Sequence, residues 1–193
     1  EKKWDKIIFS DDTIPNNEKV YLSRNHSLPT ILKDFDLKKV SFIIANGEPQ
    51  NRKKIFDKLD KSGVNFETLI DPSAIISSSA KIGKGTVICQ CSSISSSVKI
   101  QSNVVLNRGS IIGHDAIVGN ESVISPYAVI GGKTQIGSRT FVGSGSLLKE
   151  KINIGNDVII SLGSVVHKNI EDELIVVGNP ARVSRRNEKK KIF

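Results

Sequence analysis

A single column of aliphatic residues recurs at every sixth position through the middle of the chain. It begins at Ile76 and ends at Val166, and all sixteen of its positions hold Ile, Val or Leu, with no residue inserted or deleted. A period of six fits neither an α-helix, with 3.6 residues per turn, nor a β-strand, with two. It is the period of hexapeptide repeats, whose short strands turn a corner and stack on the coil below. The column therefore predicts a parallel β-helix of triangular coils.

Two further columns accompany the first. Two residues before each aliphatic stands a small or β-branched residue, from Ala74 to Ser164. The residue after the aliphatic is often glycine, as at Gly83, Gly113 and Gly131. We expect these glycines to adopt positive φ where the chain turns each corner. Aromatic residues make up only 5% of the chain, which fits a core that is a narrow stack of aliphatics.

Residues 1–71 lack the six-residue period and predict a separate α/β unit. Its expected elements are a short buried strand over 6–10, a helix over 27–35 with Ser27 as N-cap, an apolar strand over 40–45, a basic helix over 49–61 and a strand over 64–70. Residues 72–167 are then the β-helix domain. Residues 168–193 are the closing segment, in which a polar helix or tail is expected to follow the stretch 176–182.

Composition limits the classes of partner. The formal net charge of +8 and the pI near 9.5 suit either a lysine-rich surface or an anionic ligand such as a nucleotide, coenzyme A or phosphate. Nucleic acid is not expected, because no basic run is interleaved with aromatic residues. We expect Cys89 and Cys91 to be reduced thiols. Neither a membrane span nor a signal peptide is apparent. Since the chain contains no Met, we expect the sequence to begin inside a longer gene product.

Three stretches carry a specific resemblance: IANGEPQNRKK at 44–54, NRGSIIGHD at 107–115 and VVGNPAR at 176–182. Together with the repeat they resemble the NeuD/PglD-like family of hexapeptide-repeat sugar acetyltransferases, over about residues 5–185. The resemblance implies a mainly β fold, a left-handed parallel β-helix preceded by a Rossmann-like unit. It also implies a homotrimer in the bacterial cytoplasm that binds acetyl-CoA between subunits and needs no metal. The left hand comes from the resemblance alone, since the general rule for crossovers favours a right hand.

The amino-terminal unit departs from the family pattern. Family members have a strand and a Gly-rich loop before the element matched here by residues 6–12. That segment is missing from this sequence, so the Rossmann-like unit is expected to be truncated; the alternative is a degraded nucleotide site.

His114 and Asp115 are the candidate catalytic pair. A base that takes a proton from a sugar amine or hydroxyl needs a pKa near neutrality and a partner that fixes its tautomer. The resemblance places the general base at His114, the adjacent acid at Asp115 and a polar residue that orients the acceptor at Asn107. It implies direct transfer, with the oxyanion stabilised by backbone N–H groups at Gly131 and Gly132. The alternative for a single histidine is simple exposure.

The resemblance also assigns binding residues by position. For acetyl-CoA these are Gly132, Ser144, Leu162, Pro180 and Arg182, the last as a phosphate contact. For the nucleotide sugar they are Asp11, Asp12, Asn46, Gly47 and Arg52, with Arg52 expected to contact phosphate. The alternatives are ordinary turn glycines and an arginine on a solvated helix face.

Several functions remain open. The first is N-acetylation of a nucleotide-linked amino sugar for bacterial surface glycan synthesis. The second is O-acetylation of a sialic acid or related hydroxyl, slightly favoured by Val123, where several family members have a second histidine. The third is a non-catalytic β-helix scaffold. A zinc enzyme is disfavoured, because only His114 and His167 lie in the repeat and three histidines are needed.

Overall fold

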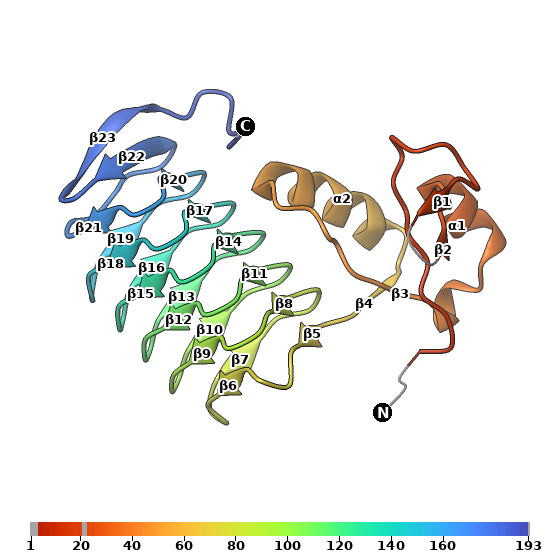
Figure 1. Cartoon of the computed structure of the whole chain (residues 1–193), viewed down its shortest axis with the longest axis horizontal. Helices are drawn as coiled ribbons and strands as arrows, with labels where there is room; N and C mark the ends of the chain where they lie inside the picture. The colour runs from red at the N-terminus through yellow and green to blue at the C-terminus, as the bar shows by residue number, and fades with distance from the viewer. Residues whose placement is uncertain (1–3, 21–22, 193) are drawn as a thin grey trace.

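A computed structural model describes residues 4–20 and 23–192. Figure 1 shows a prism of stacked coils beside a smaller α/β unit, with the chain passing from one to the other through β4 and β5. Residues 1–3 and 21–22, which belong to the predicted first unit, and residue 193 of the predicted closing segment lie outside the described residues.

The prism confirms the parallel β-helix. Each member of the aliphatic column is the second residue of a two-residue strand, and each strand pairs in parallel with the strand 18 residues away, as Ile100 does with Val118. The strands form one face of five strands, one of six and one of eight. Their bounds are β5 Leu69–Ile70, β6 Ile75–Ile76, β7 Lys81–Ile82, β8 Val87–Ile88, β9 Ser93–Ile94, β10 Lys99–Ile100, β11 Val105–Leu106, β12 Ile111–Ile112, β13 Ile117–Val118, β14 Val123–Ile124, β15 Val129–Ile130, β16 Gln135–Ile136, β17 Phe141–Val142, β18 Leu147–Leu148, β19 Asn153–Ile154, β20 Ile159–Ile160 and β21 Val165–Val166.

The aliphatic column is the core of the prism. From Ile88 to Val166 its side chains are no more than 4% exposed. The column of small residues packs beside it. The hydroxyl groups of that column can be buried because they form hydrogen bonds. Thr86 Oγ1 donates to Gln101 O at 3.0 Å, and Ser122 Oγ donates to Gly137 O at 2.8 Å. Each hydroxyl thus supplies a partner for a corner carbonyl, which keeps buried polar atoms hydrogen-bonded.

The expected role of the glycines after the column was wrong. Positive φ falls two residues further along the chain, at Gly85 and, with φ 58°, at Asp115. The glycines of the column are needed for close approach between coils instead. A Cβ at Gly83 would lie 2.6 Å from Gln101 C, and one at Gly113 would lie 2.5 Å from Gly132 N. No side chain fits between backbones that are this close.

The amino-terminal unit contains the two helices that the sequence predicts. They are α1 (Leu28–Asp34), which follows Ser27, and α2 (Pro49–Lys61). The other elements are the 3₁₀ turn Leu37–Lys39, the antiparallel pair β1 (Lys19–Val20) and β2 (Ser23–Arg24), and the parallel pair β3 (Ser41–Phe42) and β4 (Asn65–Phe66). A small core of Leu28, Ile44, Phe56, Leu59 and Val64 holds the unit together.

The buried strand expected over residues 6–10 is not formed. Phe9 makes one isolated parallel bridge to Asn25, and Ile7 is 70% exposed. Within the described residues this bridge does not extend into a ladder, and Ile7 faces solvent.

The closing segment also differs from the prediction. Instead of a polar helix or tail, the chain forms β22 (Leu174–Gly178) and β23 (Ala181–Arg186), an antiparallel hairpin whose first strand pairs in parallel with β20. This hairpin continues the eight-stranded face at the top of the prism. The chain then returns to α2, where Ile192 N donates to Glu48 Oε2 at 2.9 Å. The domain boundaries at 71/72 and 167/168 stay predictions.

Candidate active site

His114 and Asp115 form the turn between β12 and β13, at the corner where the six-stranded face meets the five-stranded face. The His114 Nδ1 and Asp115 Oδ2 atoms are 2.8 Å apart. Asp115 is held in place by its own N–H, which donates to Ser96 O at 2.9 Å. A carboxylate that accepts from Nδ1–H keeps Nε2 unprotonated and able to accept a proton. The side chains of His114 and Asp115 are about half exposed, at 59% and 48%, so a ligand can reach the imidazole.

Gly132 lies directly against this imidazole, one coil further on. A Cβ at Gly132 would sit 2.7 Å from His114 Nε2, so only glycine leaves room for the ring in this position. The two turns are joined by a hydrogen bond from Lys133 N to His114 O, 2.7 Å. The structure therefore brings Gly132 and His114 together. Gly131 N–H donates to Leu148 O, so of the two glycines only Gly132 has an N–H that no described residue accepts.

The other predicted acetyl-CoA residues lie away from His114 in the single chain. Ser144 and Leu162 occupy successive turns between the eight-stranded and six-stranded faces, joined by a bond from Gly163 N to Ser144 O at 2.8 Å. We call this column of turns the Ser144 corner. Leu162 is 79% exposed. Pro180 and Arg182 belong to the β22–β23 hairpin, where the Arg182 guanidinium is exposed and donates to Ala181 O.

Asn107 directly follows β11 and is the first residue of one of the turns that form the Ser144 corner. Its Nδ2 donates to Ile124 O at 3.3 Å, and its backbone carbonyl accepts from Ser92 Oγ. The six-stranded face separates this corner from His114. The structure therefore does not place Asn107 beside the imidazole of the same chain.

The predicted nucleotide-sugar residues of the first unit stabilise two loops. Asp11 Oδ1 accepts from Thr13 N and Oγ1, at 2.8 and 2.6 Å, and these bonds lower the pKa of Asp11. Asp12 Oδ1 accepts from the first N–H of α1, and its other oxygen lies 3.7 Å from Lys58 Nζ on α2. Asn46 Oδ1 accepts from Glu48 N at 2.9 Å, just after Gly47 and before α2. Both loops border α2.

Arg52 is not placed to contact a phosphate. Its side chain is fully buried, and its nitrogens donate to Ile44 O, Asn46 O, and both oxygens of Asn103. Burial lowers the pKa of Arg52 to about 10, with Glu121 opposing that shift. The structure contradicts both interpretations of Arg52, the phosphate contact and the solvated helix face, because its guanidinium is buried and hydrogen-bonded inside the protein.

Asn103 was missed by the sequence reasoning. It belongs to a third column of turns, which we call the α2 corner, where the eight-stranded face meets the five-stranded face. The sequence offered no signal for it, because polar residues with positive φ recur at intervals of 18 at the His114 corner as well. The column consists of Asn103, Glu121, Arg139 and Asp157.

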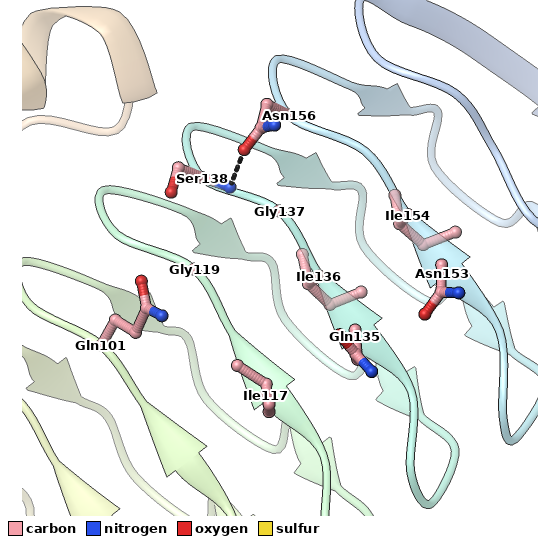
Figure 2. A pocket seen from close by; sticks show the side chains of 10 residues that line it. All are labelled: Gln101, Ile117, Gly119, Gln135, Ile136, Gly137, Ser138, Asn153, Ile154 and Asn156. Carbon is pink, nitrogen blue, oxygen red and sulfur yellow. Dashed lines mark hydrogen bonds between the residues drawn. The ribbon is translucent and has the colours of Figure 1, made fainter.

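The prism surface carries at least two hollows. The larger, of about 370 Å³, is on the five-stranded face (Figure 2). Its lining includes the amide side chains of Gln101, Gln135 and Asn153 and the glycines Gly119 and Gly137. The smaller, of about 210 Å³, involves Ser79, Lys81, Ser97, Val98 and Lys99. None of the residues proposed from the sequence lines either hollow.

Two further findings concern the described residues. Within residues 4–20 and 23–192, no group of three or more His, Cys, Asp or Glu side chains is arranged to hold a metal ion. None of the helices described there has the length and apolar character needed to cross a membrane.

Known proteins share this architecture. Residues 65–180 match the family described as the GMPPB C-terminal domain. A 49-residue stretch is 51% identical to the UDP-N-acetylbacillosamine N-acetyltransferase of Bacillus subtilis, and this stretch covers 25% of the chain and only 23% of that relative's length.

Solved structures extend the likeness to nearly the whole chain. The acetyltransferase domain of PglB from Neisseria gonorrhoeae superposes with a TM-score of 0.87 at 26% identity, over 93% of this chain and 87% of that one. PerB from Caulobacter crescentus, solved with CoA and GDP-perosamine, gives a TM-score of 0.80 at 24% identity, over 84% and 79% of the two chains. Because the family match spans well over half of the chain, the protein belongs to the family of the GMPPB C-terminal domain, and its fold is the left-handed β-helix of the hexapeptide-repeat sugar acetyltransferases.

Proposed function

We propose that the protein transfers the acetyl group of acetyl-CoA to the amino group of a nucleotide-linked amino sugar, in bacterial surface glycan synthesis. The observation that carries this proposal is the His114–Asp115 pair, which is packed against Gly132 on an open corner of the prism. The fold shared with the PglB acetyltransferase domain and the local identity to an N-acetyltransferase support the same reaction.

The pair suits direct acyl transfer. The amine of the acceptor attacks the thioester carbonyl, and His114 Nε2 removes the proton from that nitrogen as the C–N bond forms. Asp115 holds the Nδ1 proton and stabilises the imidazolium. The Gly132 N–H is suited to stabilise the oxyanion. The C–S bond then breaks, and the imidazolium returns its proton to the coenzyme A thiolate.

A homotrimer would complete the site. Ile75, Ile111 and Leu147 point outward from the six-stranded face and are 73%, 44% and 47% exposed. This face lies between the His114 corner and the Ser144 corner. Packing it against other copies buries the apolar side chains and brings one chain's base toward the next chain's Ser144 corner. We infer that acetyl-CoA binds there, with Gly132, Ser144, Leu162, Pro180 and Arg182 as contacts.

The acceptor would be held by the amino-terminal unit. Asn46 and Gly47 follow β3, and ligands of α/β sheets bind at the carboxyl ends of parallel strands. Asp11 and Asp12 border the same helix and can accept hydrogen bonds from ribose hydroxyls. PerB, with its bound GDP-perosamine, shows that a protein with this fold can hold such an acceptor.

Cys89 and Cys91 are both free thiols, as expected if the enzyme works in the cytoplasm.

The test is an acceptor panel with acetyl-CoA and the full-length protein. It contains nucleotide-linked 4-amino sugars, the matched sugars with a hydroxyl in place of the amine, and a sialic acid. Release of free thiol measures turnover, and mass spectrometry locates the acetyl group. We expect turnover with an amino sugar. Turnover with hydroxyl acceptors alone would assign O-acetylation, and no thiol release with any acceptor would favour a scaffold.

A further inference from the structure

Helix α2 docks on the prism through the α2 corner (Figure 1). Arg52 is at the centre of this contact, with Nε and Nη2 donating to Asn103 O at 3.0 and 2.8 Å, and Asn103 Nδ2 donates back to Arg52 O at 3.3 Å. Gln50 also donates to Asp157 from the same helix. Arg52 and Asn103 are both 0% exposed, so water does not compete for these hydrogen bonds.

The acceptors of Arg52 are unusual for a buried guanidinium. All of them are neutral, namely the carbonyls of Ile44, Asn46 and Asn103 and the amide oxygen of Asn103. The Glu121 carboxylate favours the charged form of Arg52, but every hydrogen bond of the guanidinium named here goes to a neutral oxygen. A buried charge is costly and persists where its hydrogen bonds are satisfied. Those hydrogen bonds depend on geometry, so they fix the positions of the groups they join.

Two of these acceptors belong to the loop that precedes α2. Arg52 Nη1 donates to Ile44 O at 2.6 Å and to Asn46 O at 3.0 Å. The same loop carries Asn46 and Gly47 at the carboxyl end of β3. The Arg52 side chain thus binds the carbonyls of this loop and also joins the loop to the prism that carries His114.

We propose that Arg52 is a positioning residue, which holds the acceptor-binding loop at residues 44–47 in register with the β-helix through Asn103. This inference rests on the proposed function. It differs from a phosphate contact in one respect that can be measured, because only the positioning role requires Asn103.

The chain offers a conservative variant for Asn103. Its φ is 58°, and the matching position one coil earlier is Gly85 with φ 72°. Asn103→Gly therefore keeps the backbone conformation and the main-chain carbonyl that accepts from Nε and Nη2, while removing the side-chain amide that exchanges hydrogen bonds with Arg52. Arg52→Met removes the guanidinium, and Lys54→Met removes an exposed charge from the same helix as the matched control.

The experiment measures the KM values for the nucleotide-sugar acceptor and for acetyl-CoA, together with amide hydrogen exchange over residues 44–48. We expect Arg52→Met to raise the acceptor KM by about tenfold or more, since small displacements of a binding group are costly. Asn103→Gly should raise it by a smaller factor, because the main-chain carbonyl of residue 103 still accepts from Arg52. The KM for acetyl-CoA should be unchanged, and exchange in the loop should become faster. The double variant should resemble Arg52→Met, because the Asn103 side chain acts only through the guanidinium. Lys54→Met should resemble the wild type.

Two results would overturn the inference. A raised acceptor KM in Arg52→Met with normal loop exchange in that variant, together with a normal KM in Asn103→Gly, would assign direct phosphate binding. A lowered melting temperature in both variants, with normal KM values and normal loop exchange, would leave a structural role only. If the wild type turns over no acceptor, the proposed function fails, and loop exchange alone still decides whether Arg52 holds the loop.

Discussion

The His114 corner and the α2 corner have the same backbone and opposite uses. Asp115 and Asn103 both have φ 58° at the second position of a prism turn. Asp115 is about half exposed and pairs with the base, whereas Asn103 is fully buried and pairs with Arg52. The local conformation is set by the repeat, and the surroundings of each corner determine whether its side chain faces a ligand or another part of the chain.

Among substitutions at the His114 corner, removal of the base should have the largest effect on kcat. We expect His114→Ala to lower kcat by about 10² or more, the usual scale for loss of a general base. The melting temperature should stay unchanged, because the side chain is exposed. His167→Ala, at another exposed histidine of the prism, is the control. A near-normal rate in the His114 variant would remove this residue from the mechanism.

A side chain that crowds the imidazole of His114 should have the second-largest effect on kcat. A Cβ at Gly132 would meet the imidazole, so we expect Gly132→Ala to displace His114 and lower kcat by roughly tenfold to a hundredfold. Gly145→Ala is unsuitable as a control because of its positive φ; Ser96→Ala, on the same corner one coil before His114, is suitable. Wild-type kinetics in Gly132→Ala would show that the ring position does not matter.

Asp115→Asn should have a smaller effect. The amide keeps the shape and tolerates positive φ, but it stabilises the imidazolium less well. We expect kcat to fall by about tenfold, because a neutral amide accepts a weaker hydrogen bond from Nδ1–H than a carboxylate does. Wild-type kcat in this variant would show that the Asp115 charge does not support the base.

At the α2 corner we expect the free energy of unfolding to depend on pH through Glu121. Glu121 is 6% exposed, and burial raises its pKa, with Asp57 adding to the rise and Lys53, Arg139 and Arg52 opposing it. Protonation of Glu121 therefore stabilises the fold below its unfolded pKa, and this contribution is lost as pH rises through the folded pKa.

Glu121→Gln should consequently raise the free energy of unfolding at about pH 7 and leave it little changed near about pH 4. Denaturant unfolding at both pH values measures this difference. A Gln variant that is less stable at neutral pH would show that the charged carboxylate is favourable at this corner.

Sequence reasoning succeeded where the chain repeats. The position of each prism strand follows from the aliphatic column, and α2 follows from its own apolar stripe and Pro49. It failed at residues 6–10, where an apolar run had no periodic context to show whether a neighbouring strand exists. It also failed at Arg52, because its partner Asn103 is 51 residues away and long-range contacts leave no local pattern. His114, Asp115 and Gly132 were predicted as site residues, and the structure brings these three together.

The central claim is that the base of one copy serves a thioester held at the Ser144 corner of the next. It can be tested by mixing two variants, His114→Ala and Leu162→Arg, then dissociating and reassembling them. Each variant alone should be inactive. If sites form between copies, random assortment of equal amounts should restore about a quarter of the wild-type sites. Full activity in Leu162→Arg alone, or no activity in the reassembled mixture, would contradict the account.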